Sequence, residues 1–240
     1  MIDRDASRMR AAERLVVLTG AGISAESGVP VFRGRGGLWR QFRPEQLATP
    51  EAFDDQPELV WEWYLWRRAR IAAVHPNAGH LAIAGWQRQR GGVSLFTQNV
   101  DGLHARAGSV DATELHGNVW RVRCAAGCGF AARDEATAGP RTRLRCHCGA
   151  WLRPDVVWFG EVLDAAAIEA AIAAAAEAEV LLVVGTSSVV YPVAALPEIA
   201  RRRGARIVEV NVEETALTAA ADAVLRGTAG AVLPRLWERT

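Results

Sequence analysis

Short apolar runs alternate along this chain with longer stretches in which apolar residues recur at helical spacing. Runs of four or five apolar residues are typical of strands covered on both faces, and flanking Pro, Asn, Asp and Gly residues mark helix ends. Strands are expected over 15–18, 93–97, 156–159, 180–184 and 206–210, and helices over 1–14, 57–74, 77–90, 164–178, 192–204 and 229–238. Strands that alternate with helices imply a parallel sheet with right-handed crossovers.

Two segments break this alternation. Residues 35–57 are expected to be irregular, because a glycine pair and Pro44, Pro50 and Pro57 act as breakers. Residues 119–153 hold all the cysteines and few long apolar runs, so they form a candidate inserted module.

A glycine-rich turn follows the first expected strand. Gly20, Gly22 and Ala25 form the pattern G-x-G-x-x-A, a variant of the dinucleotide fingerprint. A helix beginning near Ile23 would point its free N–H groups at an anion such as a pyrophosphate. The acidic residue that usually binds ribose about 20 residues later is missing, since Glu45 does not end a strand.

Three more polar clusters follow apolar runs. They are QNVD at 98–101, GTSS at 185–188 and NVEE at 211–214. The carboxyl ends of parallel strands share one sheet edge, where open α/β sheets bind their ligands. Together with the glycine-rich turn, these clusters predict a nucleotide site.

Length and charge restrict the function further. The chain has 240 residues, half of them hydrophobic, and a net charge of +1, which argues against a broad polyanion-binding surface. No apolar run approaches the 18 to 20 residues, roughly, that span a bilayer. Because the first fifteen residues also lack a signal-peptide core, we expect a cytoplasmic location. Cysteines there are reduced thiols or metal ligands.

The four cysteines form two close pairs. Cys124 and Cys128 have C-x3-C spacing, and Cys146 and Cys148 flank His147. Two such pairs, roughly twenty residues apart, suit a tetrahedral zinc site with no open position, so the zinc is structural. His147 could replace one cysteine, although four ligands are present without it. An arginine-rich zinc knuckle that binds nucleic acid is an alternative, but the module is short and has little aromatic interleaving.

The expected fold class is therefore α/β: a Rossmann-like parallel sheet domain with an inserted small zinc-binding module and a helical insertion. The Rossmann-like nucleotide-binding domain is assigned to 1–34, 75–118 and 154–240, the helical part of the small domain to 35–74, and the zinc-binding module to 119–153.

Taken together, these motifs resemble the sirtuins, the NAD-dependent protein lysine deacylases. The matching segments are GAGISAESGVPVFRG (20–34), TQNVDGLH (97–104), ELHGN (114–118), the cysteine pairs, LRPDVVWFGE (152–161) and VVGTSSVVYP (183–192). Tyr64 and Arg67, in WEWYLWRR, resemble the Y-x-x-R pair of the class III branch. The cysteine spacings, Asp155 in place of a common His, and Val212 in place of a small polar residue depart from the family pattern.

The resemblance implies a reaction that joins NAD cleavage to deacylation. The acyl-lysine carbonyl oxygen attacks the carbon bearing nicotinamide, a ribose hydroxyl attacks the resulting imidate, and water releases lysine. The products are nicotinamide, free lysine and O-acyl-ADP-ribose. His116 matches the family base, and imidazole suits proton transfer near neutral pH.

The resemblance also assigns residue roles. His116, Asn99 and Asp101 are the implied catalytic residues, with Asn99 and Asp101 at the nicotinamide end. Implied cofactor contacts are Gly20, Ala21, Gly22, Ser24, Glu26, Phe32, Arg33, Gln98, Asn99, Val100, Asp101, His116, Gly185, Thr186, Ser187, Asn211, Glu213, Thr228 and Ala229. Implied substrate contacts are Tyr64, Arg67, Val157, Trp158, Phe159, Gly160, Glu161, Val190 and Tyr191. Phe32 would cover the reacting carbon, and Asn211 would replace the missing ribose acid.

The acyl preference follows from the same resemblance. Tyr64 and Arg67 lie at i and i+3 of a helix, where a phenol and a guanidinium can hold a carboxylate. We therefore expect removal of succinyl, malonyl and glutaryl groups, with acetyl as a weaker substrate, and residues 157–161 pairing with the substrate backbone. The alternatives are an enzyme that is predominantly a deacetylase, an NAD glycohydrolase or ADP-ribosyltransferase, and a non-enzymatic module that binds NAD or acyl-lysine. The expected partners are acyl-lysine proteins or peptides, with no membrane or specific nucleic acid, and the chain is expected to be a monomer.

Overall fold

A six-stranded parallel sheet forms the larger part of the molecule. The structure is a computed structural model, and it describes residues 2–31, 43–138 and 144–237. The sheet has the order β3-β2-β1-β7-β8-β9, and each neighbouring pair is parallel. Its strands are β1 (Leu15–Thr19), β2 (Val93–Thr97), β3 (Thr113–Glu114), β7 (Val180–Val184), β8 (Arg206–Asn211) and β9 (Ala223–Arg226). The predicted α/β fold with a parallel sheet is confirmed.

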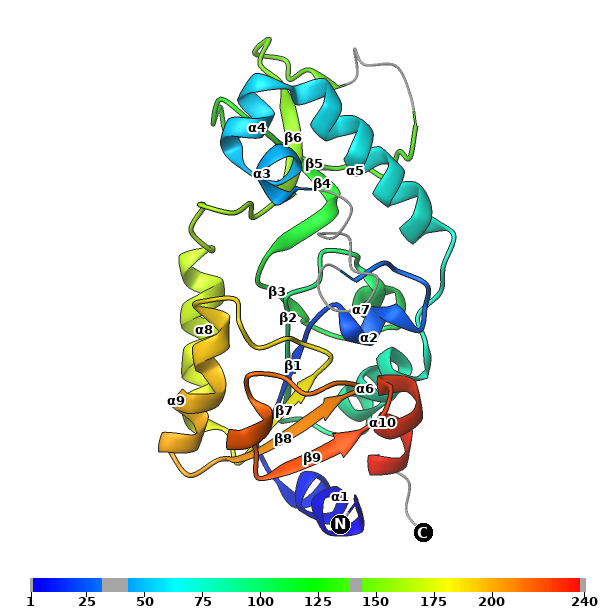
Figure 1. Cartoon of the computed structure of the whole chain (residues 1–240), viewed down its shortest axis with the longest axis vertical. Coiled ribbons are helices and arrows are strands. Elements are labelled where there is room, and N and C mark those ends of the chain that lie inside the picture. Colours follow the sequence, from blue (N-terminus) through cyan, green and yellow to red (C-terminus); the bar gives the residue numbers. More distant parts are fainter. Residues whose placement is uncertain (1, 32–42, 139–143, 238–240) are drawn as a thin grey trace.

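Helices cover both faces of this sheet (Figure 1). One face packs against α1 (Ile2–Ala11), α6 (Ala78–Gln89) and α10 (Ala229–Trp237). The other packs against α8 (Ala165–Glu177) and α9 (Leu196–Arg202). Short helical segments complete the connections: α2 (Gly22–Ala25), α7 (Leu103–Arg106), η3 (Val193–Ala195) and η4 (Thr218–Ala220). The predicted caps of α6 and α8 are confirmed, since the side chains of Asn77 and Asp164 accept from backbone N–H groups of the first turn.

The remaining elements form a smaller part, at the top of Figure 1. It contains α3 (Pro44–Leu47), α4 (Pro50–Asp55), α5 (Pro57–Ala72) and an antiparallel sheet of β5 (Ala131–Arg133), β4 (Gly117–Cys124) and β6 (Leu152–Val156). A single core joins α5 to this sheet, with Trp61, Tyr64, Val122, Cys146 and Trp158 among its buried members. This core also includes Val29, Val100 and Trp158, from segments that the sequence analysis assigned to the larger domain, so the exact division into two domains stays a prediction.

A buried arginine fixes α5 against the antiparallel sheet. The Arg68 side chain is fully buried and pairs with Asp134 at 2.8 Å. Its Nε also donates to the Val119 carbonyl oxygen at 2.6 Å. A buried guanidinium is stable only when it is paired and hydrogen-bonded, so these contacts hold α5 in one position relative to β4.

Two local expectations were wrong. Pro44, Pro50 and Pro57, interpreted as breakers, each lie in the first turn of a helix, where the missing N–H costs no hydrogen bond. The expected strand at 156–159 ends at Val156, because β6 pairs with β4 over Leu152–Val156 and the chain then turns away. No helix within the described ranges combines the length and the apolar character needed to cross a membrane.

The loops after β1 and β7 meet through their backbones. A Cβ added to Gly22 would lie 2.7 Å from Gly185 Cα, and one added to Gly20 would lie 2.7 Å from Thr186 Cβ. The Gly22 N–H donates to the Gly185 carbonyl oxygen at 2.7 Å. Only glycine permits this approach, which brings two polar clusters of the sheet edge into contact.

We expect Gly22→Ala to reduce the free energy of unfolding by about 1–3 kcal/mol, because the new methyl group overlaps a backbone that cannot withdraw. Denaturant unfolding measures this loss. Gly85→Ala is the matched control: its Cβ would meet only the end of the Arg88 side chain at 3.9 Å. Because Gly85 lies inside helix α6, where alanine is the better helix former, Gly85→Ala should leave the free energy of unfolding unchanged or raise it. Equal stability of the two variants would contradict the close-contact explanation.

Candidate functional site

A cavity of about 540 Å³ lies at the carboxyl edge of the parallel sheet and extends to α5 and the end of β6. Loops after β1, β2, β7 and β8 contribute to its wall. The predicted convergence of four polar clusters at one edge is therefore present. Nearly all described members of the predicted cofactor and substrate sets line this cavity; Ser24 and Asp101 do not. Phe32 and Arg33 lie outside the described residues.

His116 lies between β3 and β4, on the cavity wall. Its Nδ1 is 3.0 Å from the Gln98 carbonyl oxygen. Because a carbonyl only accepts, Nδ1 carries the proton and Nε2 holds the free electron pair of the neutral ring. Burial lowers the pKa of His116, and the hydrogen bond to Gln98 opposes this shift. The imidazole is thus a neutral proton acceptor at neutral pH.

Asn99, Ser24 and Asp101 form a directed chain of hydrogen bonds. The Asn99 amide nitrogen donates to Ser24 Oγ at 3.2 Å, and Ser24 Oγ donates to an Asp101 oxygen at 2.8 Å. The other Asp101 oxygen accepts from the Leu103 N–H at 2.8 Å. Asp101 is 4 % exposed and lies behind the cavity wall. In this structure, therefore, hydrogen bonds through Ser24 and Asn99 connect Asp101 to the cavity wall.

A second pair of buried groups supports the same wall. His80 and His104 lie with ring centroids 4.8 Å apart, and His80 Nε2 is 3.4 Å from Ser24 Oγ. Burial lowers the pKa of His80 to about 4 and that of His104 to about 3. Both rings are therefore uncharged near neutral pH. Sequence reasoning gave them no role, although His104 belongs to a quoted motif.

Amide groups organise the opposite end of the cavity. The Gln98 side chain donates to Thr186 Oγ1 at 2.9 Å, and the Asn211 side chain donates to the Thr186 carbonyl oxygen at 3.0 Å. The Glu26 carboxylate accepts from the Gly230 N–H, in the first turn of α10, at 2.6 Å. An anion at a helix N-terminus is favourable, so Glu26 ties the glycine-rich loop to α10.

Aromatic residues surround Tyr64 and Arg67 on α5. Both side chains line the cavity, and Arg67 is 6 % exposed. The Arg67 guanidinium carbon lies 5.0 Å from the centre of the Trp63 ring, and the Trp158 indole nitrogen donates to the Tyr64 hydroxyl at 2.8 Å. Burial lowers the pKa of Arg67, while the charge of Asp101 opposes this shift. A cation in so apolar a setting favours an anionic ligand.

Several wall residues were not assigned as ligand contacts from the sequence. Five of them lie inside segments that the sequence analysis quoted: Ala25, Val31, Val156, Val212 and Glu214. Trp63 precedes Tyr64 in the Y-x-x-R segment and could also have been found. The others, Ala48, Leu163, Val210, Thr215 and Gly227, lie outside the quoted motifs and reach the wall through tertiary folding.

The segment 157–161 is on the wall but is not an open strand edge. Four of its five N–H groups bond within the protein: Val157 to the His116 carbonyl, Phe159 to the Ala48 carbonyl, Trp158 to the Glu161 carboxylate and Glu161 to the Trp158 carbonyl. Pairing with a substrate backbone stays a prediction. It would have to use the carbonyl groups of this segment or replace these bonds.

The four cysteines meet in one cluster. Their sulfur atoms all lie within 4.8 Å of one another, and two pairs, Cys124 with Cys148 and Cys128 with Cys146, are 3.5 Å apart. Thiolates about 2.3 Å from a zinc ion at tetrahedral angles lie about 3.8 Å apart, so the cluster fits zinc. His147 packs edge-on against the Phe130 ring, with centroids 5.6 Å apart, and is not needed as a ligand. With four thiolates bound, the ion would have no open position, so its role is structural.

A Rossmann-like domain with a dinucleotide-sized cavity and a four-cysteine module defines a class of NAD-binding proteins with a zinc module. The Sir2 family model matches residues 20–192. NAD-dependent protein deacylase 2 of Pyrobaculum aerophilum is 53% identical over 233 residues, which cover 97% of this chain and 93% of that protein. The chain belongs to the Sir2 family.

Solved structures agree with this assignment. A crystal structure of a Sir2 homolog–NAD complex superposes with a TM-score of 0.89 at 45% identity, covering 97% of this chain and 91% of that one. A Sir2–p53 peptide–NAD+ structure has a TM-score of 0.85 at 30% identity, covering 98% and 97%. The predicted family, the NAD-dependent protein deacylase activity, and NAD with a structural zinc as its cofactors are confirmed.

We expect the purified protein to hold one zinc ion per chain, and Cys128→Ser to hold less and to unfold at lower denaturant, because a three-thiolate site binds zinc more weakly. Elemental analysis and denaturant unfolding measure the two effects. His147→Ala, the matched control from the same module, should keep its zinc. Loss of zinc in that control would make His147 a ligand.

Proposed function

We propose that this deacylase prefers lysine side chains that carry acidic acyl groups: succinyl, malonyl and glutaryl. The observation that supports the proposal is the buried Arg67 guanidinium, which shares the cavity with Tyr64 and with His116. A carboxylate at the end of the acyl chain can pair with this cation and accept a hydrogen bond from the phenol. Acetyl lacks that carboxylate and is expected to be the weaker substrate.

We propose that His116 is the general base. NAD, when bound, supplies the ribose carbon that is attacked and the hydroxyl groups that receive the acyl group. His116 holds Nδ1–H on the Gln98 carbonyl, so its Nε2 is the atom that can accept a hydroxyl proton. The Gln98 backbone therefore fixes both the ring orientation and the tautomer of the base.

Asn99 is proposed to orient the nicotinamide end. Its amide nitrogen donates to the Gly20 carbonyl oxygen at 3.1 Å and to Ser24 at 3.2 Å. These bonds leave the amide oxygen as the acceptor for a ligand amide. Asp101 holds the Ser24 hydroxyl in the donor direction, so it is assigned a positioning role here. Burial raises the pKa of Asp101, while Ser24 and the Leu103 N–H oppose the shift.

The polar loops at the far end of the cavity are proposed to bind the adenosine half of NAD. Asn211 already bonds the Thr186 carbonyl and, through its amide oxygen, the Val212 N–H at 2.9 Å. A ribose contact would use the second amide hydrogen of Asn211. Gly20, Ala21 and Gly22 line the cavity, so a pyrophosphate can lie against their backbone. The N–H groups of Ile23 and Ser24 are already bonded to carbonyls, so α2 itself offers less to an anion than the sequence indicated.

The partners of this site are proposed to be acylated lysines in proteins or peptides. The likeness to a Sir2–p53 peptide–NAD+ structure supports a peptide ligand, and residues 157–161, Val190 and Tyr191 line the cavity as expected for substrate contacts. Two further expectations, that the chain is a monomer and that it is located in the cytoplasm, stay predictions from the sequence.

Arg67→Met should lower kcat/KM for a succinyl-lysine peptide roughly 10- to 100-fold, since a charge-assisted hydrogen bond to the acyl carboxylate is lost. The acetyl-lysine reaction should change much less. Nicotinamide release and free peptide are measured with matched peptides. Arg70→Met is the control, because Arg70 lies on the same helix but stacks on Trp66 at 4.6 Å, away from the cavity wall. Equal succinyl and acetyl rates, unchanged in Arg67→Met, would exclude the carboxylate site.

The acid limb of kcat/KM should have its midpoint below pH 6.5, the ordinary value for histidine. Burial lowers the pKa of His116, so the neutral base persists as the pH falls and activity is lost only when the ring is protonated. The pH profile of a succinyl-lysine peptide tests this.

His116→Ala should reduce turnover at least 100-fold, roughly, while calorimetry still detects NAD binding. His75→Ala serves as the control, because His75 is not on the cavity wall. A midpoint above pH 6.5, or an active His116→Ala enzyme, would reject the assignment of the base.

A further inference from the structure

The Tyr64 hydroxyl accepts a hydrogen bond inside the cavity wall. Its partner is the Trp158 indole nitrogen at 2.8 Å, and an indole N–H can only donate. The phenol oxygen therefore uses one lone pair toward Trp158. Its own proton can then be donated to another acceptor, such as a ligand. Burial raises the pKa of Tyr64, so the phenol keeps this proton through neutral and mildly alkaline pH.

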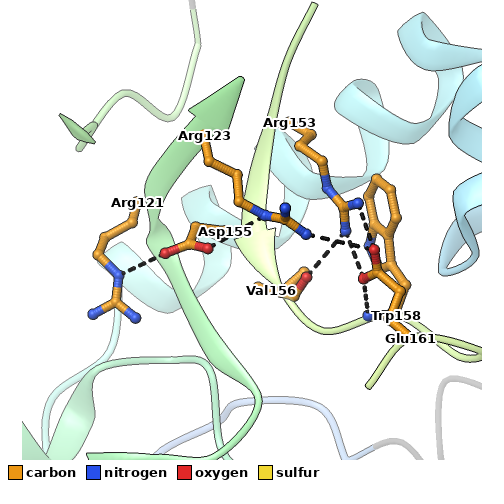
Figure 2. A network of polar contacts seen from close by, with 7 residues as sticks. All are labelled: Arg121, Arg123, Arg153, Asp155, Val156, Trp158 and Glu161. Atoms are coloured by element: carbon orange, nitrogen blue, oxygen red, sulfur yellow. Dashed lines mark hydrogen bonds and ion pairs between the residues drawn. The ribbon is translucent and has the colours of Figure 1, made fainter. Parts of the chain in front are cut away.

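Trp158 is held from several directions, as Figure 2 shows. The Arg153 guanidinium carbon lies 3.5 Å from the centre of the Trp158 ring. Both terminal nitrogens of Arg153 donate to the Glu161 carboxylate, at 2.6 and 2.8 Å. The same carboxylate accepts from the backbone N–H of Trp158 at 2.8 Å. Phe53 packs against the indole with ring centroids 5.2 Å apart. With 3 % of its surface exposed, Trp158 has little freedom to rotate.

The network of polar contacts around Trp158 extends outward along β4 and β6. Arg123 lies between Asp155 and Glu161, at 3.5 and 3.4 Å, and Arg121 pairs with Asp155 at 3.1 Å (Figure 2). These outer arginines are more than two-fifths exposed, so their ion pairs are screened and add little energy. The part that fixes Trp158 is the inner pair of Arg153 and Glu161, whose side chains are 8 % and 19 % exposed.

We propose that Trp158 is a specificity-determining positioning residue, which directs the Tyr64 hydroxyl to donate toward a carboxylate at the end of the acyl chain. The inference rests on the proposed preference for acidic acyl groups and extends it to a residue outside the Y-x-x-R pair. A donor bonded to the phenol oxygen also polarises its O–H group, which strengthens donation to an anion. Acetyl has no acceptor at that position, so Trp158 acts on the choice of acyl group.

Glu161 has a structural role besides the substrate contact that stays a prediction. Its carboxylate lies on the cavity wall and binds Arg153 and the Trp158 backbone N–H. Burial raises the pKa of Glu161, but these bonds outweigh burial and the pKa is lowered overall. The Glu161 carboxylate is therefore charged at neutral pH. We therefore assign Glu161 to holding Trp158 in place.

Trp158→Phe tests the proposal, because phenylalanine keeps a ring between Arg153 and Phe53 but lacks the indole N–H. We expect the succinyl-to-acetyl ratio of kcat/KM to fall roughly 3- to 10-fold, the loss of a neutral hydrogen bond. In Trp158→Phe/Tyr64→Phe the ratio should be no lower than in Tyr64→Phe alone, since the effect passes through the hydroxyl.

Trp61→Phe is the matched control. Trp61 is also a buried indole of the small domain, and its N–H donates to the Leu152 carbonyl at 2.7 Å, away from the cavity wall. It should lose comparable stability but keep the wild-type acyl ratio. A changed ratio in this control would attribute the effect to general loosening and overturn the proposal.

The outcomes separate the two proposals. An unchanged ratio in Trp158→Phe, with a lowered ratio in Arg67→Met and Tyr64→Phe, would overturn the role of Trp158 and leave the acyl preference standing. An unchanged ratio in all three would overturn both.

A measurement without any change to Trp158 gives a second test. Among the indole N–H signals of the nine tryptophans in the NMR spectrum, one should move upfield in Tyr64→Phe. That signal should also respond to a succinyl-lysine peptide more than to an acetyl-lysine peptide. A spectrum without this response would contradict the proposal even if Trp158→Phe does not fold.

Discussion

Backbone contact between the loops after β1 and β7 is the constraint on which the site depends. Gly22 and Gly185 approach so closely that a single methyl group cannot be inserted between them. This contact holds two strand-end loops together, and hydrogen bonds from Gln98 and Asn211 to Thr186 add the loops after β2 and β8. The result is a continuous polar wall at one edge of the sheet. A chain with bulkier residues here could keep the fold and still lose the wall.

The small domain completes the cavity from the other side through aromatic and charged side chains. Arg68 anchors α5 to β4, and the inner pair of Arg153 and Glu161 anchors Trp158 next to Tyr64. The two sides of the cavity are therefore held by different kinds of contact. Backbone carbonyls of the large domain bind the side chains of His116 and Asn99. Stacked rings and a buried ion pair surround Tyr64 and Trp158.

Local signals allowed much of the fold to be predicted. Asn77 and Asp164 mark helix starts because capping acts within one turn, and the apolar runs became the central strands. The two-residue strand β3 is too short to show a pattern, and the four-residue edge strand β9 was not predicted although Ala223, Val224 and Leu225 are apolar. Motif residues such as His116 were found through the family resemblance. The contact of Trp158 with Tyr64 joins positions 94 residues apart, and only the tertiary structure shows that the Trp158 indole donates to the phenol.

The metal site and the cavity wall share one buried core. Cys124 and Cys146 belong to the same cluster as Tyr64 and Trp158, and Val100 of the loop after β2 is a further member. The four-cysteine module is therefore packed directly behind the cavity wall, although its sulfur atoms take no part in the site itself.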